Sequence, residues 1–170
     1  MLPCDIQRIL EGNVKETGIT IIELVVVVSI IGILVAGMGF SYQDWVERYE
    51  VERATKELYF DMMHARMRAM ERGREHYVVF GENSYSIIED TNESGKNDTG
   101  DERLSGFPKS TDYDLQRNVS GKVTFNGRGL ISGLQRIWVA SATDPEYDCM
   151  NVSRARVVMG RFTDGECLPK

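Results

Sequence analysis

Gly18–Phe40 reads GITIIELVVVVSIIGILVAGMGF, and this stretch decides how the rest of the chain is organised. No charged residue occurs from Leu24 to Phe40, and the 22 residues from Ile19 to Phe40 carry a single charge, on Glu23. As a helix these residues span about 33 Å, enough to cross a hydrocarbon core of about 30 Å. The length of the run and its lack of alternation therefore predict a membrane-spanning helix rather than a strand.

Glu23 is the exception within this apolar run. A carboxylate in a spanning helix costs roughly 2.5–3.5 kcal/mol on insertion scales, so it needs a partner or a purpose. It lies in the first turn of the predicted helix, where free N–H groups and the helix dipole favour an acidic group. If the chain were cut after Gly18, the new ammonium of Ile19 could pair with Glu23 of a neighbouring chain. The alternative is an uncleaved single-pass anchor with a stray carboxylate.

Lys15–Val28, KETGITIIELVVVV, resembles the class III signal of type IV pilins and type II secretion pseudopilins. The family pattern is Gly followed by Phe-Thr-Leu-Ile-Glu and an apolar run, and Ile19 and Ile21 stand here in place of the usual Phe and Leu. By position, the resemblance implies that a prepilin peptidase cuts after Gly18, that Ile19 becomes the N-methylated terminus, and that Glu23 acts in filament assembly. It implies an inner-membrane assembly platform and other pilin or pseudopilin subunits as partners.

These features divide the chain into four segments. Residues 1–18 are expected to be a cleaved leader, 19–40 a transmembrane or filament-core helix, 41–73 its amphipathic continuation, and 74–170 a β-rich globular domain. Arg8 and Lys15 place the leader in the cytoplasm, so the globular domain of this single-pass inner-membrane protein is expected in the periplasm. After assembly it would lie in a periplasmic pseudopilus or an extracellular pilus.

The continuation of the helix has its own apolar stripe. Apolar residues recur at spacings of three and four, at Val51, Ala54, Leu58, Met62, Ala65 and Ala69. Gly73 follows as the expected C-terminal cap. The pattern predicts that this half of the helix packs on a sheet.

From Arg74 onward the composition favours short strands and turns, so the expected fold is α+β, a long N-terminal helix packed on a C-terminal antiparallel β-sheet domain. Strands are predicted at 76–80, 84–89, 122–125, 130–131, 135–140 and 151–159, with a hairpin across Asn126-Gly127. Two segments resemble the globular region of GspH/FimT-type pseudopilins and minor pilins. Phe125–Gly129 is similar to a Phe-x-x-x-Gly turn, and Ser153–Arg156 to a late Ser-x-x-Arg strand.

Charge and cysteine content narrow the function further. The net charge of the 170 residues is −6, and removing residues 1–18, which carry two basic and three acidic side chains, leaves −5. An acidic chain is a poor candidate for nucleic-acid binding. Cys4 would leave with the leader, so an exported domain would keep Cys149 and Cys167. We expect these two to form a disulfide that contributes about 3 kcal/mol, the alternative being two free thiols in a reducing compartment.

One loop has the spacing of a calcium site. Residues 90–102, DTNESGKNDTGDE, place oxygen side chains at the first, third, fifth, ninth and twelfth positions and Gly at the sixth. The candidate ligands are Asp90, Asn92, Ser94, Asp98 and Asp101, with Glu102 one step further. The alternative is a solvated connection between strands, which such polar clusters usually form.

No catalytic constellation appears in the sequence, so we expect a structural subunit rather than an enzyme, with no cofactor other than this possible Ca²⁺. The resemblance implies a minor pilin or pseudopilin of a type IV pilus or a type II secretion pseudopilus. A second hypothesis keeps the anchor but makes the globular domain a binder of DNA or of a secreted substrate. Its basic strip would consist of Arg154, Arg156 and Arg161, although these also suit the solvent face of a strand.

Overall fold

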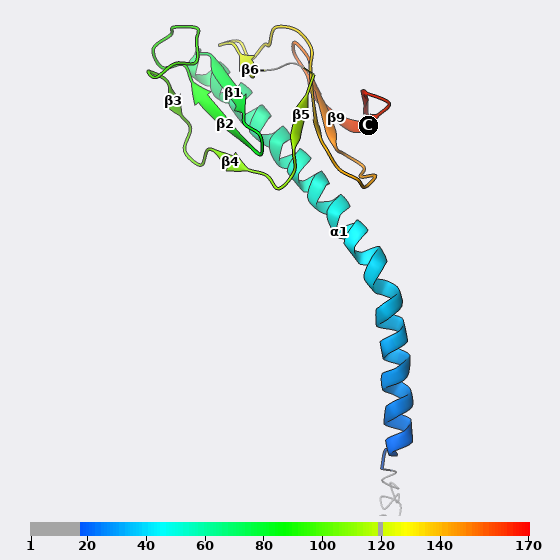
Figure 1. Ribbon diagram of the computed structural model, residues 1–170. Helices are drawn as coiled ribbons and strands as arrows, with labels where there is room; N and C mark the ends of the chain where they lie inside the picture. Colours follow the sequence, from blue (N-terminus) through cyan, green and yellow to red (C-terminus); the bar gives the residue numbers. More distant parts are fainter. Residues whose placement is uncertain (1–17, 119–120) are drawn as a thin grey trace, which may run out of the picture. The chain divides into compact units, whose positions relative to one another are not determined.

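The computed structural model describes residues 18–118 and 121–170, so residues 1–17 of the predicted leader, with Cys4, lie outside the described residues. The chain divides into two compact units, residues 1–41 and 42–170. Helix α1 (Ile21–Arg72) contributes residues to both, and all strands belong to the second (Figure 1). The strands are β1 (His76–Phe80), β2 (Ser84–Glu89), β3 (Glu102–Arg103), β4 (Lys109–Ser110), β5 (Leu115–Arg117), β6 (Lys122–Phe125), β7 (Gln135–Val139), β8 (Cys149–Val152), β9 (Val157–Thr163) and β10 (Glu166–Pro169).

The second half of α1 follows the sequence prediction. Arg72 is its last residue, and Gly73 follows with a φ of 68°, a left-handed conformation that glycine adopts without a steric penalty. The predicted stripe is buried at Val51, Leu58, Met62, Ala65 and Ala69. Ala54 is only half-buried, and the adjacent Thr55 is buried with the stripe.

The first sheet has the order β3-β2-β1-β6, with β4 also pairing with β2, and all of its pairs are antiparallel. The β1–β2 hairpin has the predicted bounds, with His76 opposite Glu89 and Phe80 opposite Tyr85. On its other side β1 pairs with β6, where His76 faces Phe125. The chain therefore returns to β1 only after β3, β4 and β5.

The second sheet has the antiparallel order β10-β9-β8-β7-β5. The prediction of one strand over residues 151–159 was wrong, because the chain turns at Ser153–Arg156. The N–H group of Ser153 donates to the carbonyl of Arg156 at 2.7 Å, and the Ser153 hydroxyl donates to the same oxygen at 2.9 Å. This turn separates β8 from β9, and it replaces the predicted Ser-x-x-Arg strand.

The helix and both sheets share one hydrophobic core, which confirms the predicted α+β class. Its members include Leu58 and Met62 of α1, Val78, Ile87, Val123 and Phe125 of the first sheet, and Ile137, Val139, Met150 and Val152 of the second. Side chains that alternate inward along each strand meet the apolar stripe of the helix in this core.

The predicted hairpin across Asn126-Gly127 was also wrong. The Asn126 side-chain oxygen accepts the N–H groups of Arg128 at 2.9 Å and Leu130 at 3.0 Å. The Asn126 N–H group donates to the carbonyl of Leu130 at 3.0 Å. Because the loop closes on itself around one asparagine, residues 130–131 form no strand, and β6 pairs with β1 instead.

This loop lies against the end of α1. A Cβ atom added to Gly127 would overlap the carbonyl of Gly73, the residue that ends the helix. Gly129 has a φ of 69°, and a Cβ atom there would meet the side chain of Met70. Phe125 is buried in the core just before the loop. The Phe-x-x-x-Gly segment therefore joins the first sheet to the C-terminal end of the helix through a backbone contact that only glycine allows.

His76 is a fully buried polar residue of β1. Its Nδ1 atom lies 3.3 Å from the carbonyl of Arg74, and its Nε2 atom lies 3.7 Å from a carboxylate oxygen of Glu89. Burial lowers the pKa of His76, because the charged imidazolium loses its water. The Arg74 carbonyl and Glu89 oppose this change, while Arg68 and Arg72 add to it. His76 is therefore neutral in the folded protein at neutral pH.

Replacing Gly127 by Ala should destabilise the globular unit by about 1–3 kcal/mol, because the new Cβ must push the loop away from the backbone of Gly73. The measurement is the denaturant midpoint of the full chain in detergent. Arg128→Ala, at the exposed neighbouring position, should change the stability by less than about 0.5 kcal/mol. Equal midpoints for the two variants would contradict the close contact.

His76 should make the protein less stable in acid. The unfolded chain binds a proton at His76 near the ordinary pKa of 6.5, whereas the folded chain binds it only at lower pH. Unfolding therefore takes up a proton between these two pKa values, and the stability falls as the pH drops through them.

The test compares denaturant midpoints at about pH 7.5 and about pH 5. His76→Gln should reduce the loss of stability between these two pH values. His64→Gln, which changes an exposed histidine, should leave the loss as large as in the wild type. If the two variants show the same loss, His76 is not the group responsible.

Candidate functional site

The residues predicted to act in processing lie just before α1, and the residue predicted to act in assembly lies in its first turn. Gly18, Ile19 and Thr20 precede the helix, and Glu23 is the acidic residue of its first turn. The Thr20 side-chain oxygen accepts the N–H group of Glu23 at 3.3 Å, and the Thr20 carbonyl accepts the N–H group of Leu24 at 3.2 Å. Thr20 is therefore the N-cap of the helix.

Thr20 is a functional residue that the sequence analysis missed. Thr20 and Glu23 have the Thr-x-x-Glu spacing of a capping box, a signal that was present in the sequence. With the cap supplied by Thr20, the Glu23 carboxylate is not needed to cap the backbone, and it extends from the first turn as an exposed group. Among residues 18–118 and 121–170, no side chain forms an ion pair with it.

The helical part of the first unit is apolar on all faces. Its large side chains are exposed from Ile19 to Val35, with exposed fractions from 49% at Val26 to 86% at Ile21. The Ser29 hydroxyl donates to the carbonyl of Val25 at 2.7 Å, so this polar group is satisfied inside the helix. A helix that is apolar all round belongs in lipid or in a packed bundle of helices.

Within the described residues, no single helix by itself meets the length and hydropathy expected of a membrane span. The two helical segments Ile21–Gly37 and Tyr42–Arg72 meet that expectation when they are taken together, by length and composition alone.

The predicted calcium loop is held together by its own hydrogen bonds. Asp90 is buried, and its carboxylate accepts the N–H groups of Ser94 at 3.1 Å and Gly95 at 2.8 Å. The Tyr77 hydroxyl donates to the same carboxylate at 3.0 Å. Burial and the two carboxylates of Asp90 and Glu75 raise the pKa of Tyr77, so it stays protonated and remains a donor. Asp90 thus anchors the loop to β1.

The other candidate ligands are likewise engaged within the loop. Asp98 accepts the Asn92 amide at 2.8 Å, the Ser94 hydroxyl at 2.9 Å and the Gly100 N–H group at 2.9 Å. These bonds lower the pKa of Asp98. Asp101 accepts the N–H group of Asp98 at 2.9 Å, and Glu102 begins β3. Over the described part of the chain, no group of three acidic, histidine or cysteine side chains lies close enough together to hold a metal ion.

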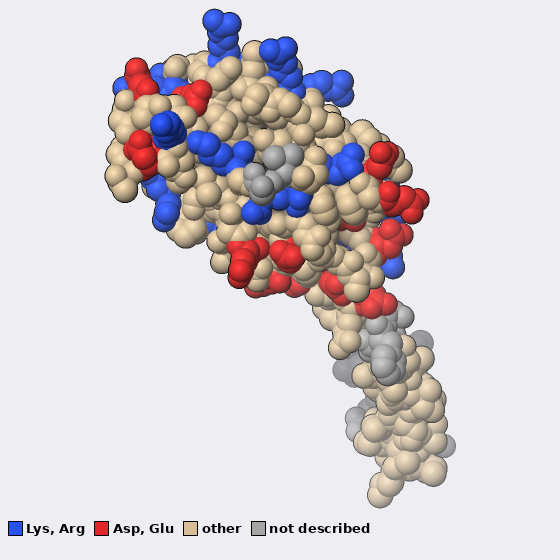
Figure 2. Space-filling view, turned by 45° about the horizontal axis from the view of Figure 1, so that its top comes forward, with Lys and Arg blue, Asp and Glu red and all other residues tan. Residues whose placement is uncertain are grey.

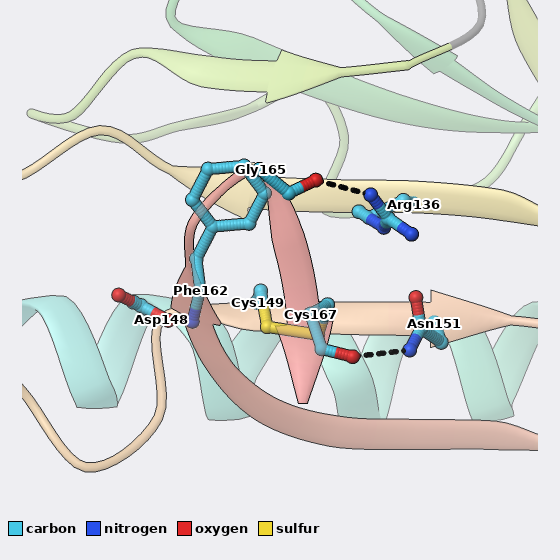
Figure 3. The surroundings of a disulfide bond; sticks show 7 residues. All are labelled: Arg136, Asp148, Cys149, Asn151, Phe162, Gly165 and Cys167. Carbon is cyan, nitrogen blue, oxygen red and sulfur yellow. Dashed lines mark hydrogen bonds between the residues drawn. A yellow bond between two sulfur atoms is a disulfide. The ribbon is translucent and has the colours of Figure 1, made fainter. Parts of the chain in front are cut away.

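The two cysteines of the globular unit are joined, as the sequence predicted. Cys149 of β8 and Cys167 of β10 form a disulfide with their Cα atoms 5.9 Å apart (Figure 3). Asn151 donates to the carbonyl of Cys167 at 2.8 Å, and Arg136 of β7 donates to the carbonyl of Gly165 (Figure 3). The C-terminal strand is therefore attached to the second sheet by a covalent bond and by side chains of β7 and β8.

The predicted basic strip does not form on one strand. Arg154 and Arg156 lie in the exposed turn between β8 and β9, while Arg161 lies within β9. Arg161 contacts Asp144 at 3.3 Å and donates to the carbonyl of Pro145 at 3.1 Å. On the face of the molecule in Figure 2, basic and acidic side chains both occur, with acidic ones along the lower border of the globular unit.

The comparison with protein families matches most of the globular unit. A family model described as type II transport protein GspH matches residues 54–156, more than half of the 170 residues. The matched range begins within α1, includes Phe125–Gly129 and ends at the turn that follows β8. Searches of curated proteins and of solved structures gave no match. The chain belongs to the GspH family of type II transport proteins, within the pilins and pseudopilins that its N-terminal signal resembles.

Proposed function

We propose that this protein is a structural, non-enzymatic pseudopilin of a type II secretion system. In this proposal, a prepilin peptidase cuts the chain between Gly18 and Ile19, and the new terminus at Ile19 is N-methylated. Before assembly, the protein is a single-pass subunit of the inner membrane with its globular unit in the periplasm. The family match to a type II transport protein favours a secretion pseudopilus over a type IV pilus.

The observation that carries this proposal is an apolar helix that the described chain leaves uncovered, preceded by Gly18 and carrying one acidic group in its first turn. A helix of this kind can leave the lipid only if an equally apolar surface replaces the hydrocarbon. Helices of neighbouring subunits offer that surface. The inner-membrane assembly platform would move each subunit from the lipid into the filament.

In this proposal, Glu23 fixes the axial position of each helix relative to its neighbour in the filament. In the filament, the ammonium of Ile19 on one subunit would meet the Glu23 carboxylate of its neighbour. Each charge alone is costly in an apolar core, and removing one partner of a buried pair costs about 3–5 kcal/mol, because the other charge is left without a counter-ion. Any axial shift of the helices would separate the two charges, so the pair favours one arrangement.

The arginines on which the second hypothesis rests, a binding module for DNA or a secreted substrate, do not form one strip. Its candidate arginines are divided between a turn and a strand, and Arg161 already has an acidic partner. Calcium is likewise not required by this function, because the loop at residues 90–102 is ordered by hydrogen bonds to Asp90 and Asp98.

Glu23→Ala should abolish incorporation into the filament without preventing cleavage. We expect the fraction of subunit recovered in cross-linked pseudopilus assemblies to fall at least about tenfold, because the ammonium of Ile19 would be left unpaired in an apolar core. The measurement is cross-linking in cells that carry the secretion system, with the intact mass of the monomer measured in parallel.

Ser29→Ala is the matched control for Glu23→Ala. It also removes a polar group from the apolar helix, but the Ser29 hydroxyl is already bonded to the carbonyl of Val25. Assembly should therefore stay at the wild-type level. Normal assembly of Glu23→Ala, or equal losses in the two variants, would contradict the proposed role of the carboxylate.

A further inference from the structure

An aromatic stripe, defined here as Tyr42, Trp45 and Tyr49, lies at the start of the helical part of the second unit. The three residues follow one another at helical spacings of three and four, and each side chain is more than 60% exposed. The ring centroids of Tyr42 and Trp45 are 6.2 Å apart, and those of Trp45 and Tyr49 are 6.1 Å apart with nearly parallel planes. The stripe is thus one continuous aromatic surface.

The neighbouring faces of the helix are tied to the globular unit, and the stripe is not. Glu47 accepts the Ser141 hydroxyl at 3.3 Å, and Glu50 accepts the Tyr113 hydroxyl at 3.0 Å. Further along, Glu52 accepts the N–H group of Glu146 at 2.9 Å. These contacts fix the rotation of the helix in the second unit, so the exposure of the stripe is a property of the fold.

The residue types on the stripe suit a boundary between apolar and aqueous surroundings. Tyr and Trp have large apolar rings with one polar end, and both are enriched where membranes meet water. Farther along the helix, the exposed apolar residues are Phe60, Met67 and Met70, which have no such polar end. The change from Tyr and Trp to Phe and Met separates the stripe from the rest of the exposed helix.

The position of the stripe along the chain matches the headgroup layer. The apolar run ends at Phe40, and at 1.5 Å per residue Tyr42 and Trp45 lie about 3 Å and about 8 Å further along the helix. The polar layer on each side of a bilayer is about 5–8 Å thick. Tyr49 comes about 14 Å of helix after Phe40, and its ring stacks on that of Trp45. Phe60 comes about 30 Å of helix after Phe40, well beyond the thickness of that layer.

We propose that Tyr42 and Trp45 bind the headgroup layer of the periplasmic leaflet, with Tyr49 supporting Trp45 by stacking. The stripe then sets the depth of the helix in the membrane before assembly, and it keeps the first turn with Glu23 near the opposite boundary. This inference rests on the proposed membrane-anchored function and adds the lipid surface that the globular end of the helix recognises.

The chain has two tryptophans, which makes the test direct. Trp138 stacks on Phe162 at 4.5 Å in the second sheet, so Trp138→Phe keeps an aromatic ring there and leaves Trp45 as the sole tryptophan. Trp45→Phe leaves only Trp138. Each full-length variant is reconstituted in phosphatidylcholine–phosphatidylglycerol vesicles that contain lipids brominated either near the headgroup or near the chain terminus.

Trp45 should lose about half of its emission to lipids brominated near the headgroup and much less to those brominated near the chain terminus. Trp138 should be quenched by neither. A third protein, the helix reporter, carries Val27→Trp with both native tryptophans changed to Phe. Its single tryptophan lies in the apolar helix itself and should be quenched most by bromines near the chain terminus.

The three proteins separate failure of this inference from failure of the proposed function. If the helix reporter is quenched and Trp45 is quenched by neither lipid, the helix is in the membrane but the stripe does not bind the headgroup layer. A blue-shifted but unquenched Trp45 would mean that a second copy of the chain covers the stripe, which also overturns the inference. If the helix reporter is not quenched, the membrane anchoring itself is wrong.

Discussion

The rest of the structure depends on one constraint, an apolar helix whose large side chains stay exposed among the residues that the structure describes. Thirteen large apolar side chains between Ile19 and Val35 are exposed in the described chain. Leaving them in water would cost on the order of 20 kcal/mol, more than the net stability of a typical domain. In the proposed function this cover comes from outside the chain, first from lipid and then from neighbouring subunits. The core that unites α1 and both sheets uses the later stripe of the helix, from Val51 to Ala69.

The hydrophobic core of the globular unit is formed without residues of the apolar segment that precedes Tyr42. The part of α1 from Tyr42 onward contributes its apolar stripe to the core of this unit. Just after the helix, the backbone of Gly127 packs directly against the backbone of Gly73. The disulfide between Cys149 and Cys167 attaches the last strand. In the proposed function, a unit that is complete in this way is carried unchanged from the membrane into a filament while the covering of the apolar helix is exchanged.

Much of the helix and of its packing could be predicted from the sequence, because both follow from residue patterns that extend over many positions. Three features could be read in this way: the apolar run, the stripe from Val51 to Ala69 and the glycine that follows the helix. In each case the local pattern and the fold agree. The errors lie where one side chain decides the backbone. Asn126 closes a loop by accepting a backbone N–H group with its side-chain oxygen. Ser153 forms a turn in a segment that has no Gly or Pro, the residues that usually mark a turn in a sequence. The loop at 90–102 is a separate case: its calcium-like spacing is visible in the sequence, but only the fold reveals that Asp90 is buried against Tyr77.

The central claim is that this helix is a processed assembly element and not a permanent anchor. The most direct test is the intact mass and N-terminal sequence of the protein extracted from membranes of cells that carry the secretion system. The account predicts a chain that begins at N-methylated Ile19 and lacks the first 18 residues. A chain that still begins at Met1 would contradict it, and the globular unit would then have to be understood as an ordinary membrane-anchored domain.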